Sequence, residues 1–335
     1  MRFWTARLGS CARTNMDEFE LIQRYFSRLG SARADVLLGV GDDAALLHVP
    51  EDADLAASVD TIVAGRHFPE ASDARSVGHR SLAVNLSDLA AMGARPAWAM
   101  LSVTLPKAES DWLEGFARGF GELARAHEVM LVGGDTTAGP LTVSVQIMGH
   151  VPRGTALRRG GGRQGDVLAV TGTIGDAGAG LALLTGALAT EDAAAASELR
   201  RRFEYPTPRV EFGAAARGLA SAAMDLSDGL AGDLPKLAAA SGLAAHVDVA
   251  RLPLSRALSS AAGAQRARDF ALGGGDDYEL LLAVPPAHFE ALGARAAALN
   301  LTLTAIGELR RGNSVQWELE GRPYVPAVQG YSHFR

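Results

Sequence analysis

Asn85-Leu86-Ser87-Asp88-Leu89-Ala90-Ala91-Met92-Gly93-Ala94 is the most informative stretch of this chain. It closes a run from Ala74 to Met92 whose spacing of apolar residues predicts a helix. Asn85 and Asp88 are three residues apart, so they share one face of that helix. We expect this polar face to look into a cleft.

Strand-like and helical runs alternate on both sides of this helix. In the first half we expect strands at 36–40, 55–63, 98–105 and 141–151, and a further helix at 111–127. After a loop rich in glycine and arginine at 153–165, we expect strands at 167–171, 244–249 and 278–284 and helices at 176–185 and 208–220. The alternation predicts an α/β (α+β) fold of two domains, 16–152 and 153–335.

The first fifteen residues share no periodicity with the residues after them. Asp17 suits the N-cap of a helix, and Glu20 follows it three residues later, as in a capping box. We therefore expect Met16 to be the true start, and residues 1–15 to be a disordered or untranslated extension.

Aspartates recur beside glycine or serine at the ends of apolar runs. They are Asp42, Asp43, Asp60, Asp88, Asp135, Asp225, Asp228, Asp276 and Asp277. A single pair of this kind is most often an ordinary turn or helix cap. Gathered in one cleft, such carboxylates would repel one another by roughly 1 kcal/mol per pair at 4 Å in water, and by more near protein. Because Mg²⁺ takes carboxylate and phosphate oxygens, the pattern predicts several magnesium ions at a phosphate site.

Lysine is scarce in this sequence. Lys107 and Lys236 are the only lysines among 32 basic residues, and neither follows a glycine-rich phosphate loop. A Walker-type loop and a protein-kinase fold each need a lysine that contacts the nucleotide phosphates, so both kinds of nucleotide-binding site are excluded. Metal ions and arginine must then neutralise the charge of a phosphoryl group.

Length and composition limit the number of domains and the kinds of partner. The chain has 335 residues, 48% of them hydrophobic, a formal net charge of −6 and one cysteine, Cys11. This length favours two domains, and the charge excludes a phosphate-tracking nucleic-acid surface. A lone cysteine makes no internal disulfide, and no apolar run reaches the length of a membrane span. We expect a soluble cytoplasmic protein whose partners are small molecules.

Five segments together resemble the thiamine-monophosphate kinase family. They are Gly39–Leu47, Asp60–Phe68, Asn85–Ala94, Gly133–Thr137 and Asp225–Gly229, and the resemblance runs from about Met16 to Phe334. It implies a two-domain fold similar to aminoimidazole ribonucleotide synthetase, with an N-terminal sheet that pairs in a homodimer. It also implies phosphorylation of thiamine monophosphate to thiamine diphosphate by ATP, the co-substrate, with several Mg²⁺ ions.

The resemblance also implies roles for individual residues. Magnesium positions fall on Asp43, Ser58, Val59, Asp60, Asp88, Asp135, Asp225 and Asp228, some acting through backbone oxygen, and of these Asp43, Asp60, Asp88, Asp135 and Asp228 would be catalytic. Nucleotide contacts fall on Gly134, Asp135, Arg159 and Ser227, and substrate contacts on His67, Asp276 and Tyr331. Taken alone, Arg158 and Arg159 are either a phosphate clamp or solvated loop charge.

Two positions depart from the family pattern. Val59 replaces a threonine, so any metal contact there would use its carbonyl oxygen. Asp276 replaces a glutamate and is one methylene shorter, which retracts its carboxylate by about 1.5 Å. Neither change removes the phosphate chemistry.

The predicted reaction is a direct in-line transfer. The second pKa of a phosphate monoester is about 6, so the attacking phosphate is already anionic and needs no strong base. Two alternatives stay open at this point. One is another ATP-using enzyme of the superfamily, such as an aminoimidazole ribonucleotide or selenophosphate synthetase; the other is a non-catalytic module that binds divalent ions.

Overall fold

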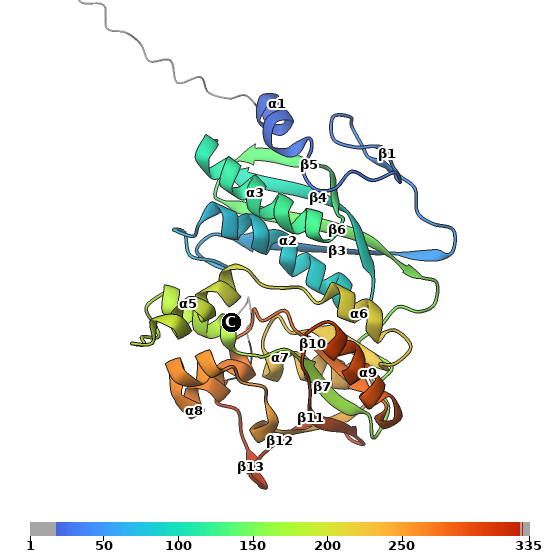
Figure 1. Ribbon diagram of the computed structural model, residues 1–335, viewed down its shortest axis with the longest axis vertical. Helices are drawn as coiled ribbons and strands as arrows, with labels where there is room; N and C mark the ends of the chain where they lie inside the picture. Colours follow the sequence, from blue (N-terminus) through green and yellow to red (C-terminus); the bar gives the residue numbers. More distant parts are fainter. Residues whose placement is uncertain (1–17, 329, 331–335) are drawn as a thin grey trace, which may run out of the picture.

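The computed structural model describes residues 18–328 and 330, and in it the chain forms two bodies stacked along the long axis (Figure 1). The upper body contains a four-stranded sheet in the order β3-β6-β4-β5, and the lower body a seven-stranded sheet in the order β13-β12-β9-β11-β7-β10-β8. The predicted α/β (α+β) fold is confirmed. The predictions for residues 1–15, Met16, Asp17 and Tyr331 lie outside the described residues.

The upper sheet carries helices on one face only. Its strands are β3 (Ala53–Val63), β4 (Arg95–Leu105), β5 (Met130–Ala138) and β6 (Thr142–Pro152), with β3–β6 and β6–β4 antiparallel and β4–β5 parallel. Along β6, Val143, Val145 and Ile147 are fully buried, whereas Gln146 is exposed. This alternation places one face against the helices α2 (Ala74–Ala91) and α3 (Ser110–Ala126) and leaves part of the other face open.

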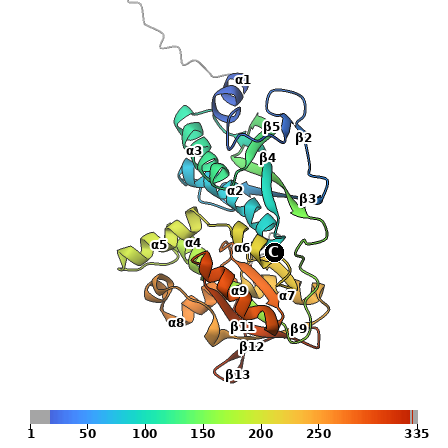
Figure 2. The same cartoon turned by 45° about the vertical axis from the view of Figure 1, so that its right-hand side comes forward.

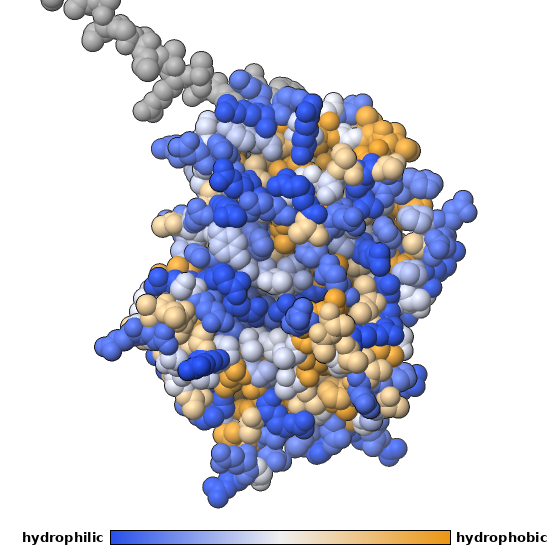
Figure 3. All heavy atoms as spheres, in the orientation of Figure 1, coloured by the Kyte–Doolittle hydropathy of each residue, from blue (hydrophilic) through white to orange (hydrophobic). Residues whose placement is uncertain are grey.

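The short elements at the start of the described chain pack beside this sheet. They are α1 (Glu18–Leu21), the π-helical turn η1 (Ile22–Phe26), β1 (Val36–Leu38) and β2 (Leu46–Leu47). Val36 and Leu47 pack with Trp98 and Met148 on the helix-free face of the sheet. Apolar side chains gather at the surface near this hairpin, while hydrophilic ones line the junction of the two bodies (Figure 3).

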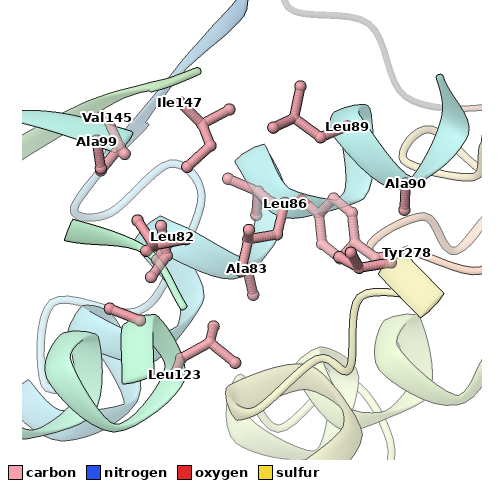
Figure 4. Close-up of a cluster of buried hydrophobic side chains, with 14 of the residues drawn as sticks. Leu82, Ala83, Leu86, Leu89, Ala90, Ala99, Leu123, Val145, Ile147 and Tyr278 are labelled. Atoms are coloured by element: carbon pink, nitrogen blue, oxygen red, sulfur yellow. The ribbon is translucent and has the colours of Figure 1, made fainter. Parts of the chain in front are cut away.

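Helix α2 is buried on nearly all sides because it lies between the two bodies. It contacts α3 and the upper sheet, and also α6 (Val210–Ala216) and β8 (Ala222–Asp225) of the lower body. Figure 4 shows Leu82, Ala83 and Leu86 of this helix among side chains of the upper sheet, with Tyr278 of the lower body close by. A helix buried all round shows no amphipathic stripe, as observed here.

Two glycines let α2 and α3 cross closely. A Cβ atom on Gly78 would lie 2.1 Å from the carbonyl oxygen of Phe116, and one on Gly119 would lie 1.9 Å from that of Arg75. Both distances are far inside van der Waals contact, so the crossing requires glycine at both positions.

The lower body completes the fold. Its remaining strands are β7 (Val167–Thr171), β9 (Ala244–Asp248), β10 (Leu280–Val284), β11 (Leu303–Arg310), β12 (Val315–Leu319) and β13 (Arg322–Tyr324), and its remaining helices are α4 (Asp176–Leu184), α5 (Ala193–Glu204), α7 (Leu230–Ala240), η2 (Val249–Arg251), α8 (Arg256–Gly273) and α9 (Pro286–Ala298). Helices α4, α5 and α8 pack together into a lobe on one side (Figure 2). No helix in the described ranges is long and apolar enough to cross a membrane.

Several predicted elements needed correction. The strand expected at 36–40 ends at Leu38, and the helix expected at 208–220 spans only Val210–Ala216. The strand expected to begin at Tyr278 begins at Leu280, because Tyr278 has a φ of +51° and cannot continue a strand. The acids are also not all at strand ends, since Asp60 and Asp135 lie within β3 and β5.

Candidate active site

Acidic side chains from both bodies converge on one cavity of about 360 Å³. The upper body contributes Asp60 from β3 and Asp88 from α2, while the lower body contributes Asp225 at the end of β8, together with Asp228 and Asp276 from loops. Arg159, from the segment that joins the bodies, also lines the cavity. The structure thus brings together five of the predicted acids.

Hydrogen bonds hold the upper two acids in place. The backbone N–H of Asp60 donates to Asn85 Oδ1 at 3.0 Å, and Ser58 Oγ donates to Asp88 Oδ2 at 2.5 Å. Asn85 and Asp88 therefore both contact β3 from one face of the helix, and their spacing had predicted the shared face. Across the junction, Ser87 Oγ donates to Asp225 Oδ2 at 2.9 Å, which connects α2 to the lower body.

Nearby cations only partly balance these carboxyl groups. Burial, and then the charge of Asp88, raises the pKa of Asp60 to about 6, although this residue keeps contact with solvent. Burial, and then Asp88, raises the pKa of Asp225 to about 7. The pKa of Asp88 is raised by burial, although Ser58 and Arg159 oppose the shift. A divalent cation would relieve this repulsion, yet no three described His, Cys, Asp or Glu side chains already surround one metal position.

The remaining predicted acids lie elsewhere in the chain. Asp43, Gly134 and Asp135 line a second cavity of about 360 Å³, beside Ile22 and Phe26. Both aspartates are exposed there. The single cleft expected from the sequence is therefore two cavities within the described chain.

Comparisons with known proteins agree with this architecture. The models "AIR synthase related protein, N-terminal domain" and "AIR synthase related protein, C-terminal domain" match residues 41–151 and 163–319. The thiamine-monophosphate kinase of Escherichia coli K12 is 46% identical over 318 residues, which is 95% of this chain and 98% of the relative. The chain belongs to the thiamine-monophosphate kinase family.

Solved structures of the family share the fold. A crystal structure of thiamine-monophosphate kinase from Stenotrophomonas maltophilia is 48% identical, with a TM-score of 0.82 over 87% of this chain and 93% of that one. A structure described as AaThiL complexed with AMPPCP and TMP is 28% identical, with a TM-score of 0.76 over 99% of this chain and 100% of that one. The resemblance recognised in the sequence is confirmed, and the chain is an enzyme of the phosphotransferase class.

Arg80, which the sequence did not reveal, binds the cavity residue Asp276 in this member of the thiamine-monophosphate kinase family. Its guanidinium, with the side chain only 3% exposed, donates from Nη2 to Asp276 Oδ1 at 2.5 Å and from Nη1 to the carbonyl oxygen of Phe203 at 2.7 Å. It also lies 4.2 Å from the ring centroid of Phe203. The only signal in the sequence was a charged residue within a helix of small and apolar residues.

The loop that carries Asp276 has an unusual backbone. Gly275, Asp276 and Tyr278 have φ values of +66°, +63° and +51°, and the Tyr278 hydroxyl donates to Asp276 Oδ1 at 3.2 Å. Two non-glycine positions of this kind in one loop cost energy and persist only where the surroundings enforce them. The backbone N–H of Asp276 donates to the carbonyl oxygen of Ser227 at 2.8 Å, so this loop is bound to the loop of Asp228.

A buried ionic cluster supports that loop from behind. Asp277 accepts hydrogen bonds from the backbone N–H groups of Gly175 and Ala177, at 2.6 Å and 3.1 Å. Glu279 is fully buried and pairs with Arg202 and Arg209. Removing one partner of a buried ion pair is strongly destabilising, so the position of the loop depends on this cluster.

Lys236 and Asp233 were also missed. Lys236 Nζ lies 2.6 Å from Asp228 Oδ2 and 2.8 Å from Asp233 Oδ1. Asp233 in turn accepts the backbone N–H groups of Ser227 and Asp228, at 3.0 Å and 2.9 Å. A buried carboxylate thus positions the loop, and one of the two lysines supplies a cation beside it. The scarcity of lysine was the available signal.

Several residues that were predicted to contact substrate or nucleotide line the main cavity. His67 and Ser227 line the main cavity together with Asp276, and the backbone N–H of Val63 donates to His67 Nδ1 at 3.0 Å. An accepting Nδ1 carries no proton, so a neutral His67 holds its proton on Nε2. Val59 points away from this group, since it lies on the open face of the sheet and is 63% exposed.

Proposed function

We propose that this chain phosphorylates thiamine monophosphate with ATP, giving thiamine diphosphate and ADP. The observation that carries the proposal is the meeting of Asp60, Asp88, Asp225 and Asp228 from both bodies in one cavity beside Arg159. Relatives named thiamine-monophosphate kinase support it, since they match nearly the whole chain.

The acids fit magnesium. The pKa values of Asp60 and Asp225 are raised first by burial and then by the charge of Asp88, and a divalent cation would offset that charge. Asp60, Asp88, Asp225 and Asp228 would hold the ions in this cavity, with Ser58 and the Val59 carbonyl beside them. Bound Mg²⁺ supplies charge neutralisation and orientation for the two phosphates. By family resemblance we also propose magnesium positions at Asp43 and Asp135, which line the second cavity, and ATP contacts at Gly134 and Ser227.

The protein's part in the reaction is to position two anions. An oxygen of the substrate phosphate forms a bond to the γ-phosphorus of ATP, and the bond from that phosphorus to the β–γ bridging oxygen breaks as ADP leaves. Arg159 would bind phosphate oxygens, as guanidinium does well. His67, Asp276 and Tyr331 would hold the substrate, with the Asp276 carboxylate suited to the cationic thiazolium ring. No side chain is needed as a base.

We also propose an oligomeric state, domain boundaries and a cellular location. A homodimer would pair the open faces of two upper sheets, where Leu55 and Val59 are exposed. We propose domains at 16–152 and 153–335, since the upper sheet ends at Pro152 and the lower one begins at Val167. A cytoplasmic location fits a single cysteine and small-molecule partners.

The direct test is product analysis. Purified protein incubated with magnesium, ATP and thiamine monophosphate should form ADP and thiamine diphosphate in equal amounts. ATP consumption that requires a different phosphorylated acceptor would instead support another enzyme of the superfamily. Heat on titration with metal but none with nucleotide would support a binding module.

Asp88 should be essential for turnover. Asp88→Ala removes the carboxylate between Ser58 and Asp60, so we expect turnover to fall at least a hundredfold while the melting temperature stays close to that of the wild type. Asp52→Ala, at an exposed aspartate outside the cavity, is the control and should keep full activity. Near-normal turnover of Asp88→Ala at saturating magnesium would refute this assignment.

A further inference from the structure

A third cavity, of about 660 Å³, is basic where the main one is acidic. It lies where the segment joining the two bodies passes the lower body, and its titratable lining consists of Arg158, Arg163, Arg217 and His288. No acidic residue of the described chain lines it. The neighbours Arg158 and Arg159 therefore serve different cavities, since Arg159 lines the acidic one.

The arginines of this basic cavity lack counter-charges. Arg158, Arg163 and Arg217 form no ion pair with any residue that the structure describes. In contrast, Arg153 on the same segment lies 3.8 Å from Asp54, and Arg310 lies 2.7 Å from Glu308. The three cations thus face one space without a protein anion.

Arg217 is the most buried example of a cavity arginine without a counter-charge. It is half-buried, and its Nη1 donates to the carbonyl oxygen of Gly93 at 2.5 Å. Burial, and then the positive charge of Arg95, lowers the pKa of Arg217. Arg95 does not line the cavity, so it is the half-buried Arg217 guanidinium itself, without an ion pair among the described residues, that an anion in the cavity would stabilise.

The start of α9 adds to the positive potential. Pro285 and His288 line the cavity at the N-terminal end of this 13-residue helix, where the helix dipole favours negative charge. His288 Nδ1 lies 3.1 Å from the carbonyl oxygen of Leu219, so it donates there and the ring orientation is set.

We propose that the basic cavity binds a phosphate-bearing small molecule as a metal-free polyanion. Its volume is within the range of small-molecule sites, and guanidinium groups bind phosphate oxygens directly. The acidic cavity has the opposite requirement, because its carboxylates repel a polyphosphate that carries no cation. A bound anion would join Arg158 and Arg163 of the connecting segment to Arg217 of the lower body.

Binding of metal-free pyrophosphate distinguishes the basic cavity from the acidic one. Isothermal titration of the full-length protein with pyrophosphate in excess EDTA should show one binding site per chain. In the double variant Arg158→Gln/Arg163→Gln, which changes two exposed side chains without ion pairs, the affinity should fall at least tenfold. The matched control Arg200→Gln/Arg201→Gln removes two exposed arginines of α5 and should bind as the wild type does.

Three results would overturn the proposal. The first is that metal-free pyrophosphate does not bind to the wild type, and the second is that the double variant binds it with equal affinity. The third is that Arg159→Gln alone loses binding, because this result would place the anion in the acidic cavity. The kinase assay is a separate readout, because Arg158 and Arg163 do not line the acidic cavity and their double variant should turn over normally. Failure of the kinase assay in the wild type would count against the proposed function and leave this binding result unaffected.

Discussion

Arg80 is the residue that connects helix α2 of the upper body to the loop of Asp276 in the lower one. Its charge is buried and shared between Asp276 and the Phe203 carbonyl oxygen. Burying a guanidinium is costly unless its partners are well placed. We therefore propose that Arg80 is a positioning residue, which would act on substrate through the carboxylate of Asp276.

Replacing Arg80 should affect one substrate more than the other. In Arg80→Met the Asp276 carboxylate loses its main partner, so we expect the KM for thiamine monophosphate to rise about tenfold, or about 1.4 kcal/mol, and the KM for ATP to change little. Arg80→Lys keeps the charge, so its KM for thiamine monophosphate should lie between those of the wild type and Arg80→Met. Arg118→Met, at an exposed arginine of α3, is the control. An equal rise of both KM values would show a general structural effect.

Among the elements, helix α2 determines how the two bodies meet, and its crossing with α3 depends on backbone contact. A methyl group at Gly78 would meet the Phe116 carbonyl oxygen at 2.1 Å, so the helices would have to move apart. We expect Gly78→Ala to lower the free energy of unfolding by about 1–3 kcal/mol, as overpacked cores do, measured by urea denaturation.

Gly293→Ala is the matched control for that substitution. Gly293 lies within α9, and a Cβ atom there would meet nothing within 4 Å. Alanine has the higher helix propensity, so this variant should be stabilised by about 0.5–1 kcal/mol. If both substitutions shifted stability in the same direction, the close crossing would not be the cause.

The whole molecule should respond to pH through its acidic cavity. The folded state raises the pKa of Asp60 to about 6 and of Asp225 to about 7, from an ordinary value of 3.8. The folded protein therefore binds these protons more tightly than the unfolded chain, and the resulting stability is full below about pH 4 and is lost as pH rises through 6 and 7.

Denaturation in EDTA at pH 5 and pH 8 tests this directly. The free energy of unfolding should fall between the two pH values, and Asp225→Asn should show a smaller fall because its amide does not ionise. Magnesium added at pH 8 should restore stability in the wild type. Equal slopes in the wild type and in Asp225→Asn would mean that other groups cause the pH dependence.

The open sheet face makes a prediction about assembly. Leu55 and Val59 lie on the same face of β3 and are 52% and 63% exposed, and Val59 is opposite the polar Gln146 of β6. We expect Leu55→Asp to sediment as a monomer in analytical ultracentrifugation, while Leu299→Asp, at an apolar residue 42% exposed after α9, sediments as the wild type does. A wild-type monomer at micromolar concentration would contradict the proposed dimer.

Local patterns were enough to predict much of this architecture. The helix expected at 74–92 is α2, the strand expected at 167–171 is β7, and the α/β class is confirmed. Elements with weak local signals were missed, among them β5, where glycine and polar residues occupy a strand held by β4. The roles assigned to individual site residues remain predictions.

The sequence by itself determined the class of chemistry, because the choice of aspartate over lysine and the spacing of Asn85 and Asp88 are properties of neighbours in the chain. Only the tertiary structure decided which acids meet. It joined Asp60 and Asp88 to Asp225, left Asp135 in another cavity, and brought Arg80 to Asp276, 196 residues later. Such contacts arise from the packing of two bodies around α2, and no local periodicity encodes how distant segments pack.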